Sequence, residues 1–338
     1  MPESAAVGSR ALGALYGLAI GDALGMPTQS LPRGEVVARY GGLIATFRAG
    51  PPGHPLAAGL PAGTVTDDTE QAVLLGRLVA RSGGRVDPAE LASELLAWEE
   101  SMRARGSLDL LGPSSRRALD ALASGAAVDE AGRYGVTNGA AMRVTPVGVA
   151  TPSGDPRLLE DRVVAASRVT HNTGVALAGA AAVAAAVSAG IDGIPLPGVI
   201  EFAVAAAASA ARRGHWVAGA DVAARIAWAT DLTAGLQPDQ VIDTVYRLVG
   251  TSLATQESVP AAFAVAAAAP DDPWLACRIA ASLGGDCDTI AAMTGAICGA
   301  SHGMQAFPQA ARDTVASVNG LSLDALASGL LAVRAGAR

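Results

Sequence analysis

Apolar residues recur along most of the chain at the spacing of helix faces, and several stretches are apolar on every side. Almost no stretch alternates apolar and polar side chains, which is the pattern of a half-buried strand. Turn residues and prolines divide the apolar pattern into separate helices. We predict helices at about 9–24, 69–82, 87–98, 139–144, 163–169, 175–191, 198–213, 219–233, 238–250, 257–269, 274–283 and 290–298. The pattern therefore predicts an all-α fold, formed as one compact multi-helix domain over residues 1–338.

The most apolar run, residues 175–191, is short and is made mainly of alanine and glycine. A membrane-spanning helix needs about 20 predominantly apolar residues, so we interpret this run as a buried core helix. The N-terminus lacks the basic segment and the long apolar segment of a signal peptide. We therefore expect no association with a membrane and a location in the cytoplasm.

Two acidic clusters interrupt the apolar pattern, and each lies where a loop becomes a helix. A single cluster of this kind is typical of a helix N-terminus, because threonine caps the helix and acidic residues favour the positive end of its dipole. Two such clusters, each followed by a buried helix, indicate a shared centre. Four carboxylates converge in a folded protein only if cations neutralise them. The clusters consist of Thr66, Asp67 and Asp68, and of Asp286, Asp288 and Thr289.

The oxygen atoms of these side chains are hard ligands, which suit Mg²⁺ or Mn²⁺ and, less well, Ca²⁺. Six ligand residues exceed the need of one magnesium ion that keeps its waters. They match two ions that share a carboxylate bridge, although a single ion stays an alternative. Two metal ions about 4 Å apart clamp substrate oxygens and lower the pKa of a bound water.

Composition narrows the class of function. Hydrophobic residues make up 51% of the chain, aromatic residues only 4%, and small side chains dominate, so closely packed helices are expected. Every basic residue is arginine, which excludes a lysine nucleophile. The net charge of -7 disfavours binding of nucleic acid by bulk attraction. The three cysteines (Cys277, Cys287 and Cys298) match no zinc pattern and are expected to be buried thiols of a cytoplasmic protein.

Loops supply further candidate site residues. Segments 46–63 and 105–115 are rich in glycine, proline or serine and are predicted to be long loops. A third loop enters a helix at Asn138 or Gly139, where free backbone N–H groups suit an anionic oxygen. His171 precedes the alanine-rich helix, where it could contact a phosphate or a ribose hydroxyl. Ordinary helix caps explain both features as well and are the commoner case.

Taken in order, the motifs resemble those of the ADP-ribosylglycohydrolase family. This family includes the dinitrogenase reductase-activating glycohydrolase, the eukaryotic ADP-ribosylhydrolases and J1-crystallin. The resemblance covers nearly the whole chain, and its closing Gly-Gly-Asp-x-Asp-Thr motif is the most specific part. The matching motifs are Gly21–Gly25, Thr66–Thr69, Asn138–Arg143, Thr170–His171, Glu257–Pro260 and Gly284–Thr289.

The resemblance implies an all-α fold with two Mg²⁺ or Mn²⁺ ions in a cleft, which hold the ribose hydroxyls of ADP-ribose and a water. It implies hydrolysis of the bond from ribose C1 to an attached group, through a transition state like an oxocarbenium ion. Asp67 or Asp68 would orient or deprotonate the water. Asn138, Gly139 and His171 would line the side of the cleft that holds the diphosphate and ribose. The implied metal ligands are Thr66, Asp67, Asp68, Asp286, Asp288 and Thr289.

One position departs from the family pattern. Many members carry a glutamate shortly after the Gly-Asp-x-x-Gly motif, and Gln29 occupies that place here, where we expect it to bind the substrate. Glutamine cannot act as a base, so a serine-linked substrate is disfavoured relative to arginine-linked or small-molecule ADP-ribose. The alternatives are a nucleoside or nucleotide N-ribosyl hydrolase on the same centre, and a catalytically weak ADP-ribose-binding or structural protein. We expect a monomer whose partner is an ADP-ribosyl or related ribosyl substrate.

Overall fold

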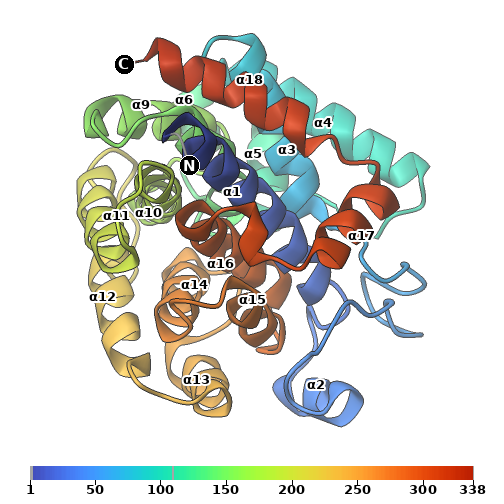
Figure 1. Ribbon diagram of the computed structural model, residues 1–338. Coiled ribbons are helices and arrows are strands. Elements are labelled where there is room, and N and C mark those ends of the chain that lie inside the picture. Colours follow the sequence, from blue (N-terminus) through green and yellow to red (C-terminus); the bar gives the residue numbers. More distant parts are fainter. Residues whose placement is uncertain (1–2, 109, 338) are drawn as a thin grey trace.

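The computed structural model describes residues 3–108 and 110–337. Within these ranges the chain forms helices and no strand, so the predicted all-α fold is confirmed (Figure 1). The helices are α1 (Glu3–Gly25), α2 (Arg33–Tyr40), α3 (Asp67–Arg81), α4 (Pro88–Ala104), α5 (Pro113–Ala123), α6 (Val128–Ala131), α7 (Gly139–Arg143), α8 (Thr145–Ala150), α9 (Pro156–Ser167), α10 (Gly174–Ile191), α11 (Leu196–Ala210), α12 (Val222–Thr233), α13 (Pro238–Thr244), α14 (Thr255–Ala268), α15 (Pro273–Ala281), α16 (Cys287–His302), α17 (Gln309–Asn319) and α18 (Leu323–Gly336). A π-helical turn (Val245–Val249) and a 3₁₀ turn (Met304–Ala306) complete them.

The first and the sixteenth helices form the closest pair in the centre of the molecule (Figure 1). They run antiparallel, and glycines let their backbones touch. A Cβ atom added to Gly17 would lie 2.0 Å from the carbonyl oxygen of Gly295, and one on Gly21 would lie 1.9 Å from that of Ala291. At the end of α1, a Cβ on Gly25 would lie 2.3 Å from the Cα of Asp288. This packing sets the C-terminal end of α1 against the start of α16, where the second acidic cluster begins.

The alanine-rich helix α10 is the core helix that the sequence predicts. It is long and apolar enough to cross a membrane, with a mean hydropathy of 2.0, but 89% of it is buried by the rest of the protein. Its neighbours include α8, α11 and α16. In the described part of the chain, the only other candidate for a membrane span is the pair α17 and α18, which is bent by 97°.

Some predicted boundaries are wrong. Helix α9 begins at Pro156, well before the predicted residue 163, because Asp155 caps it by accepting from the backbone N–H of Leu158. The predicted helix 238–250 is divided into α13 and the π-helical turn. The predicted loop 105–115 ends early, because α5 starts at Pro113.

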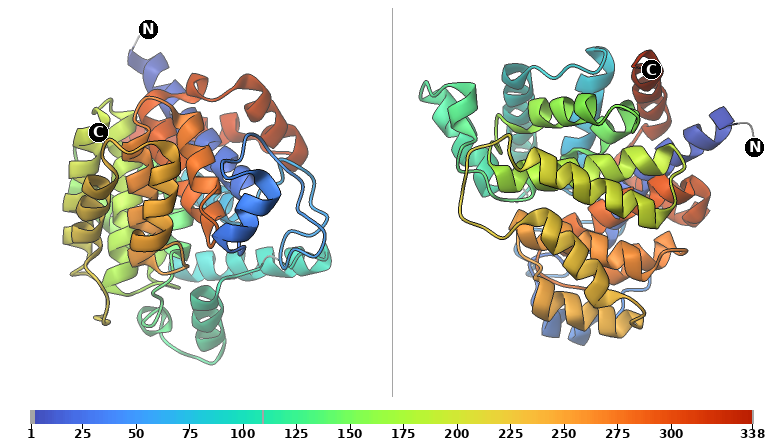
Figure 2. Two further views of the ribbon diagram at one scale, coloured as in Figure 1. Left: turned by 90° about the horizontal axis from the view of Figure 1, so that it is seen from below. Right: turned by 90° about the vertical axis from the view of Figure 1, so that its left-hand side faces the viewer.

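Six helices are absent from the prediction: α2, α5, α6, α8, α17 and α18. Three of them, α2, α6 and α17, bury only one or two side chains each, so their apolar pattern is weak. Helix α18 does carry helical spacing, and the prediction omits it. The predicted loop 46–63 contains no helix, and it lies with α2 on the side of the molecule opposite to α10 and α11 (Figure 2).

Candidate active site

The first acidic cluster is fixed by a carboxylate from another helix. Thr66 is the N-cap of α3 and accepts from the backbone N–H of Asp68. Asp22 of α1 accepts from the backbone N–H groups of Thr66 and Thr69, at 3.0 and 3.1 Å, and from both threonine hydroxyls, at 2.8 and 2.5 Å. Burial raises the pKa of Asp22 to about 6, and these hydrogen bonds oppose that rise. Sequence reasoning assigned no role to Asp22, although a lone carboxylate in an apolar helix is a usable signal.

The two aspartates of this cluster point in different directions. Asp67 lines a cleft, and its Oδ2 accepts from Gln71 Nε2 at 2.8 Å. Asp68 is buried, and its Oδ2 lies 3.1 Å from the hydroxyl of Thr66 and 3.2 Å from that of Thr289. Only Asp67 of the pair therefore faces the cleft directly.

The second cluster opens α16 and meets the first. Asp286 Oδ2 accepts from Asn138 Nδ2 at 2.5 Å, and burial raises the pKa of Asp286 to about 6. The side chain of Thr289 is hydrogen-bonded to Asp286 and also lies 3.2 Å from Asp68 Oδ2. One threonine side chain thus joins two clusters that lie 221 residues apart in the chain.

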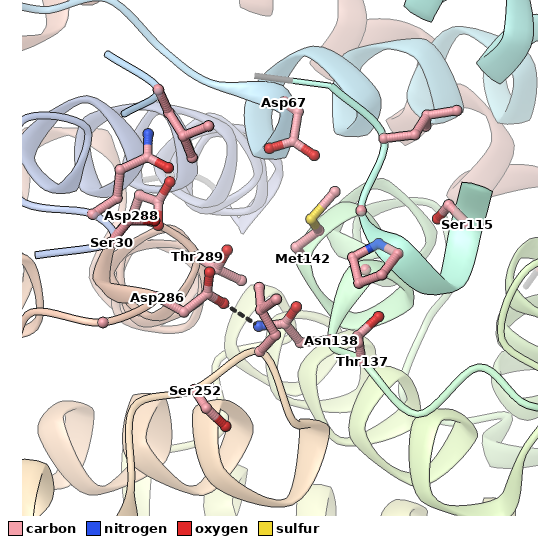
Figure 3. Close-up of a pocket in the computed structure, with 18 of the residues that line it drawn as sticks. Ser30, Asp67, Ser115, Thr137, Asn138, Met142, Ser252, Asp286, Asp288 and Thr289 are labelled. Atoms are coloured by element: carbon pink, nitrogen blue, oxygen red, sulfur yellow. Dashed lines mark hydrogen bonds between the residues drawn. The ribbon is translucent and has the colours of Figure 1, made fainter. Parts of the chain in front are cut away.

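A cleft of about 680 Å³ runs between these elements (Figure 3). Four predicted site residues point into it from the acidic clusters, and three more lie on its walls. The predicted residues that line it are Gln29, Asp67, Asn138, Gly139, Asp286, Asp288 and Thr289. Leucines 56, 108, 110, 111 and 253 form much of the remaining wall. The structure places these seven residues at the cleft, and their roles stay predictions.

His171 lies behind the wall of the cleft and not in it, which corrects the expected contact with substrate. The side chain is fully buried, and its Nε2 lies 3.0 Å from the hydroxyl of Thr137, which does line the cleft. A Cβ atom on Gly139 would lie 2.9 Å from the ring, so the ring packs against α7 only because a glycine stands there. Thr66 and Asp68 also lie outside the lining.

Gln29 lies one turn beyond α1 and is almost fully buried at the cleft. Among the described residues, its Nε2 has no hydrogen-bond partner. A buried amide donor without a partner costs free energy, so this N–H group is suited to an acceptor that binds in the cleft. The observation agrees with the expected role of Gln29 in substrate binding.

The loop 250–254 holds both Asn138 and Asp286 in place, which sequence reasoning did not foresee. The carbonyl of Thr251 accepts from the N–H of Asp286 at 2.7 Å, and that of Leu253 accepts from the N–H of Asn138 at 2.9 Å. Glu257 in turn accepts from the N–H of Ser252 at 3.1 Å. Glu257 belongs to one of the motifs that match the family, so the sequence marked this residue but did not predict its role.

A buried arginine interacts electrostatically with Asp67 of the first cluster. Arg143 ends α7 and is fully buried, and burial lowers its pKa to about 10, whereas Asp67 acts to raise it. Its Nη2 donates to Thr170 Oγ1 at 2.6 Å. Its Nε and Nη1 have no hydrogen-bond partner within the described ranges.

The donor chemistry of the site fits a hard divalent cation. Every candidate ligand offers oxygen, and burial raises the pKa of Asp286, so a bound cation would stabilise its ionised form. The distances between the candidate ligands fit a bound ion less well. In the part of the chain that the structure describes, no three Asp, Glu, His or Cys side chains are grouped closely enough to hold one ion. The residues therefore suit a metal by chemistry, and the metal centre itself stays a prediction.

Comparisons with known proteins agree with this geometry. A model of the family described as ADP-ribosylglycohydrolase matches residues 3–338. The chain is 37% identical over 326 residues to the uncharacterised protein YegU of Escherichia coli, covering 96% of this chain and 97% of that one. It is 32% identical over 286 residues to an uncharacterised protein of Archaeoglobus fulgidus, covering 85% of each.

Two further matches carry a functional name. The chain is 36% identical over 167 residues to the ADP-ribosyl-[dinitrogen reductase] glycohydrolase of Rhodospirillum rubrum, covering 49% of this chain and 52% of that one. A solved structure titled ADP-ribosylglycohydrolase-related protein complex superposes with a TM-score of 0.69 at 25% identity, covering 97% of this chain and 98% of that one. The acidic clusters, the all-α fold and the family match over nearly the whole chain lead to one conclusion: this protein belongs to the ADP-ribosylglycohydrolase family.

Proposed function

We propose that this protein is a metal-dependent hydrolase that cleaves the bond between ribose C1 and an attached group in ADP-ribosylated substrates. The observation that carries the proposal is the junction at Thr289, where both acidic clusters meet at one cleft. Membership of a glycohydrolase family supports the reaction class.

The proposed metal ligands are the six oxygen donors of the two clusters. Asp67, Asp286, Asp288 and Thr289 reach the cleft, and Thr66 and Asp68 support them from behind. Two Mg²⁺ or Mn²⁺ ions bound there would orient the ribose hydroxyls and lower the pKa of a water.

The residues of the chain perform the remaining tasks. Asp67 faces the cleft and is the proposed base that takes a proton from the attacking water, with Asp68 as the alternative. The water oxygen bonds to C1, the C1–N or C1–O bond breaks with its electron pair leaving on the departing group, and the proton is delivered to that group. The carboxylates around the cleft stabilise the positive charge that develops on the ribose.

Gln29 bears on the choice of substrate. Its amide cannot take a proton, so we propose that it binds the substrate and that Asp67 supplies the base. Arginine-linked ADP-ribose and small ADP-ribosyl molecules are the proposed substrates, in preference to serine-linked ADP-ribose. We also propose that the protein acts as a monomer and that it works in the cytoplasm, where buried free thiols such as its three are usual.

A release assay tests the proposal. Arginine-linked ADP-ribose, serine-linked ADP-ribose, O-acetyl-ADP-ribose and adenosine would each be incubated with Mg²⁺ or Mn²⁺, with and without a chelator. We expect release from the first or third substrate, loss of release with the chelator, and a decrease of at least about 100-fold in Asp67→Asn. Asp239→Asn, which changes an exposed aspartate of α13, is the matched control and is expected to match the wild type.

The five leucines of the cleft favour a second candidate, hydrolysis of an uncharged nucleoside. Release from adenosine alone would select it. Metal-independent release, or no release from any of the four compounds, would contradict the proposed function.

A further inference from the structure

Four side chains form a continuous line of hydrogen bonds from the core to the cleft. Arg143 Nη2 donates to Thr170 Oγ1 at 2.6 Å. Thr170 Oγ1 lies 2.7 Å from His171 Nδ1, and His171 Nε2 lies 3.0 Å from Thr137 Oγ1. The first three residues are fully buried, whereas Thr137 is half-buried and lines the cleft beside Asn138 (Figure 3).

The chemistry of the groups fixes the direction of the protons in this line. A guanidinium group can only donate, so Thr170 Oγ1 accepts from Arg143. The Thr170 hydroxyl then has two acceptors within reach, His171 Nδ1 at 2.7 Å and the carbonyl of Ser167 at 3.4 Å, and the shorter contact is the stronger one. With Nδ1 as an acceptor, a neutral ring carries its proton on Nε2 and donates it to Thr137 Oγ1.

The ring of His171 is held neutral by its surroundings. Burial, and then the charge of Arg143, lower the pKa of His171 well below 6.5. The neutral imidazole therefore has a single N–H group, and the tautomer decides which ring nitrogen donates a hydrogen bond. Because Thr137 Oγ1 accepts a hydrogen bond from His171 Nε2, the hydroxyl hydrogen of Thr137 is available to donate to an acceptor in the cleft.

An anionic group in this cleft depends on neutral donors. No Arg, Lys or His side chain stands among the described residues that line it. Hydrogen bonds in a chain polarise one another, so the cationic end at Arg143 strengthens the donor at the other end. A hydroxyl strengthened in this way suits a charged oxygen better than a neutral one.

We propose that Thr137 is a substrate-binding residue that donates to a phosphoryl oxygen, and that Arg143, Thr170 and His171 are positioning residues that orient its hydroxyl. This inference rests on the proposed function in one respect, since it takes an ADP-ribosyl group as the occupant of the cleft. In this proposal Thr137, and not His171, contacts the substrate, and His171 acts through its hydrogen bond to Thr137.

Binding of two probes to matched variants tests the role of Thr137. Calorimetry in the presence of Mg²⁺ would compare ADP-ribose, which carries phosphates, with adenosine, which does not. Thr137→Val keeps the shape but removes the hydroxyl, and Thr137→Ser keeps the hydroxyl. We expect Thr137→Val to weaken ADP-ribose binding about tenfold, the size of one hydrogen bond to a charged group, and to leave adenosine unchanged. Thr137→Ser is expected to bind both as the wild type does.

Three outcomes of this comparison would overturn the inference. They are unchanged ADP-ribose affinity in Thr137→Val, an equal loss for adenosine, and no binding of ADP-ribose by the wild-type protein. Failure of the proposed function has a different signature. If no riboside is hydrolysed and Thr137→Val still weakens ADP-ribose binding, the hydrolase is rejected and the binding role of Thr137 stands.

The positioning line has a readout that requires no substrate. The ¹⁵N chemical shifts of the imidazole distinguish the two neutral tautomers, and the signals of His171 are identified by their loss in His171→Gln. We expect the proton on Nε2 in the wild type. Thr170→Val, which keeps the shape but removes the donor to Nδ1, is expected to shift the tautomer towards a proton on Nδ1. A wild-type ring protonated on Nδ1, or unchanged shifts in Thr170→Val, would refute the line.

Discussion

At the scale of single residues, the site depends on groups that never reach the substrate. Asp22 of α1 fixes the start of α3 by accepting four hydrogen bonds from Thr66 and Thr69. Glu257, in the first turn of α14, fixes the loop backbone that holds Asp286. Both residues belong to motifs found in the sequence, but only their hydrogen-bond partners in the structure reveal their role.

Asp22 yields a prediction about stability. In Asp22→Asn, one acceptor oxygen becomes an NH₂ group that faces N–H and O–H donors, so about two hydrogen bonds are lost. We expect the free energy of unfolding to fall by about 2–3 kcal/mol, measured by urea denaturation. The exposed change Asp239→Asn is the control and is expected to stay within about 0.5 kcal/mol of the wild type. Equal midpoints for both variants would show that Asp22 does not hold α3.

His171 yields a prediction about pH. The pKa of the folded ring lies well below the ordinary 6.5, so at lower pH the unfolded chain binds a proton that the folded chain does not. Stability from this residue is therefore complete above pH 6.5 and declines as the pH falls below it, by about 1.4 kcal/mol per pH unit. Urea denaturation between pH 5 and pH 7 would compare the wild type with His171→Gln.

The variant lacks this proton linkage, so the stability difference between the two proteins is expected to narrow as the pH falls. Both keep His54, whose pKa burial also lowers, so its contribution cancels. Parallel pH profiles would mean that the folded ring takes up its proton at the ordinary pH.

At the scale of helices, small residues decide how close the acidic clusters come. Glycines on α1 allow its backbone to touch that of α16, and this contact sets the level of Asp288 against the end of α1. Sequence composition predicted close packing in general. Which helices form the close pair was not predictable, because alanine and glycine occur throughout the chain.

A pair of matched substitutions in α1 tests this packing. A Cβ on Gly21 would lie 1.9 Å from a backbone oxygen of α16, and rigid backbone cannot give way cheaply. We expect Gly21→Ala to lower the free energy of unfolding by at least about 2–3 kcal/mol. A Cβ on Gly8, in the same helix, meets no atom within 4 Å, so Gly8→Ala is expected to be neutral or stabilising by up to about 1 kcal/mol. Similar urea midpoints for the two variants would contradict the close contact.

At the scale of the whole molecule, the cleft is assembled from segments distributed over most of the chain. Its walls come from α3, the loop before α7, the loop 250–254 and the start of α16. The carboxylates face one another only in the folded state. A cation that binds them must therefore bind the native protein far more tightly than the unfolded chain.

This difference predicts stabilisation by metal. At a concentration 100 times the dissociation constant, Mg²⁺ or Mn²⁺ is expected to raise the free energy of unfolding by about 2.7 kcal/mol, and a chelator is expected to reverse the effect. The Asp286→Asn variant, which loses a proposed ligand, is expected to gain much less, whereas Asp239→Asn gains as much as the wild type. Thermal or urea denaturation that does not change with either ion would reject the metal centre.

The sequence alone determined the helical fold, the position of both acidic clusters at helix starts, and the family resemblance. Each of these follows from patterns within a few residues, because helix periodicity, caps and motifs are local. Tertiary structure alone decided which of the predicted site residues reach the cleft. It put Asp67 in the lining and Asp68 behind it, moved His171 behind Thr137, and gave Asp22 its partners. Those placements depend on contacts such as the one between Thr289 and Asp68, 221 residues apart, which no local pattern encodes.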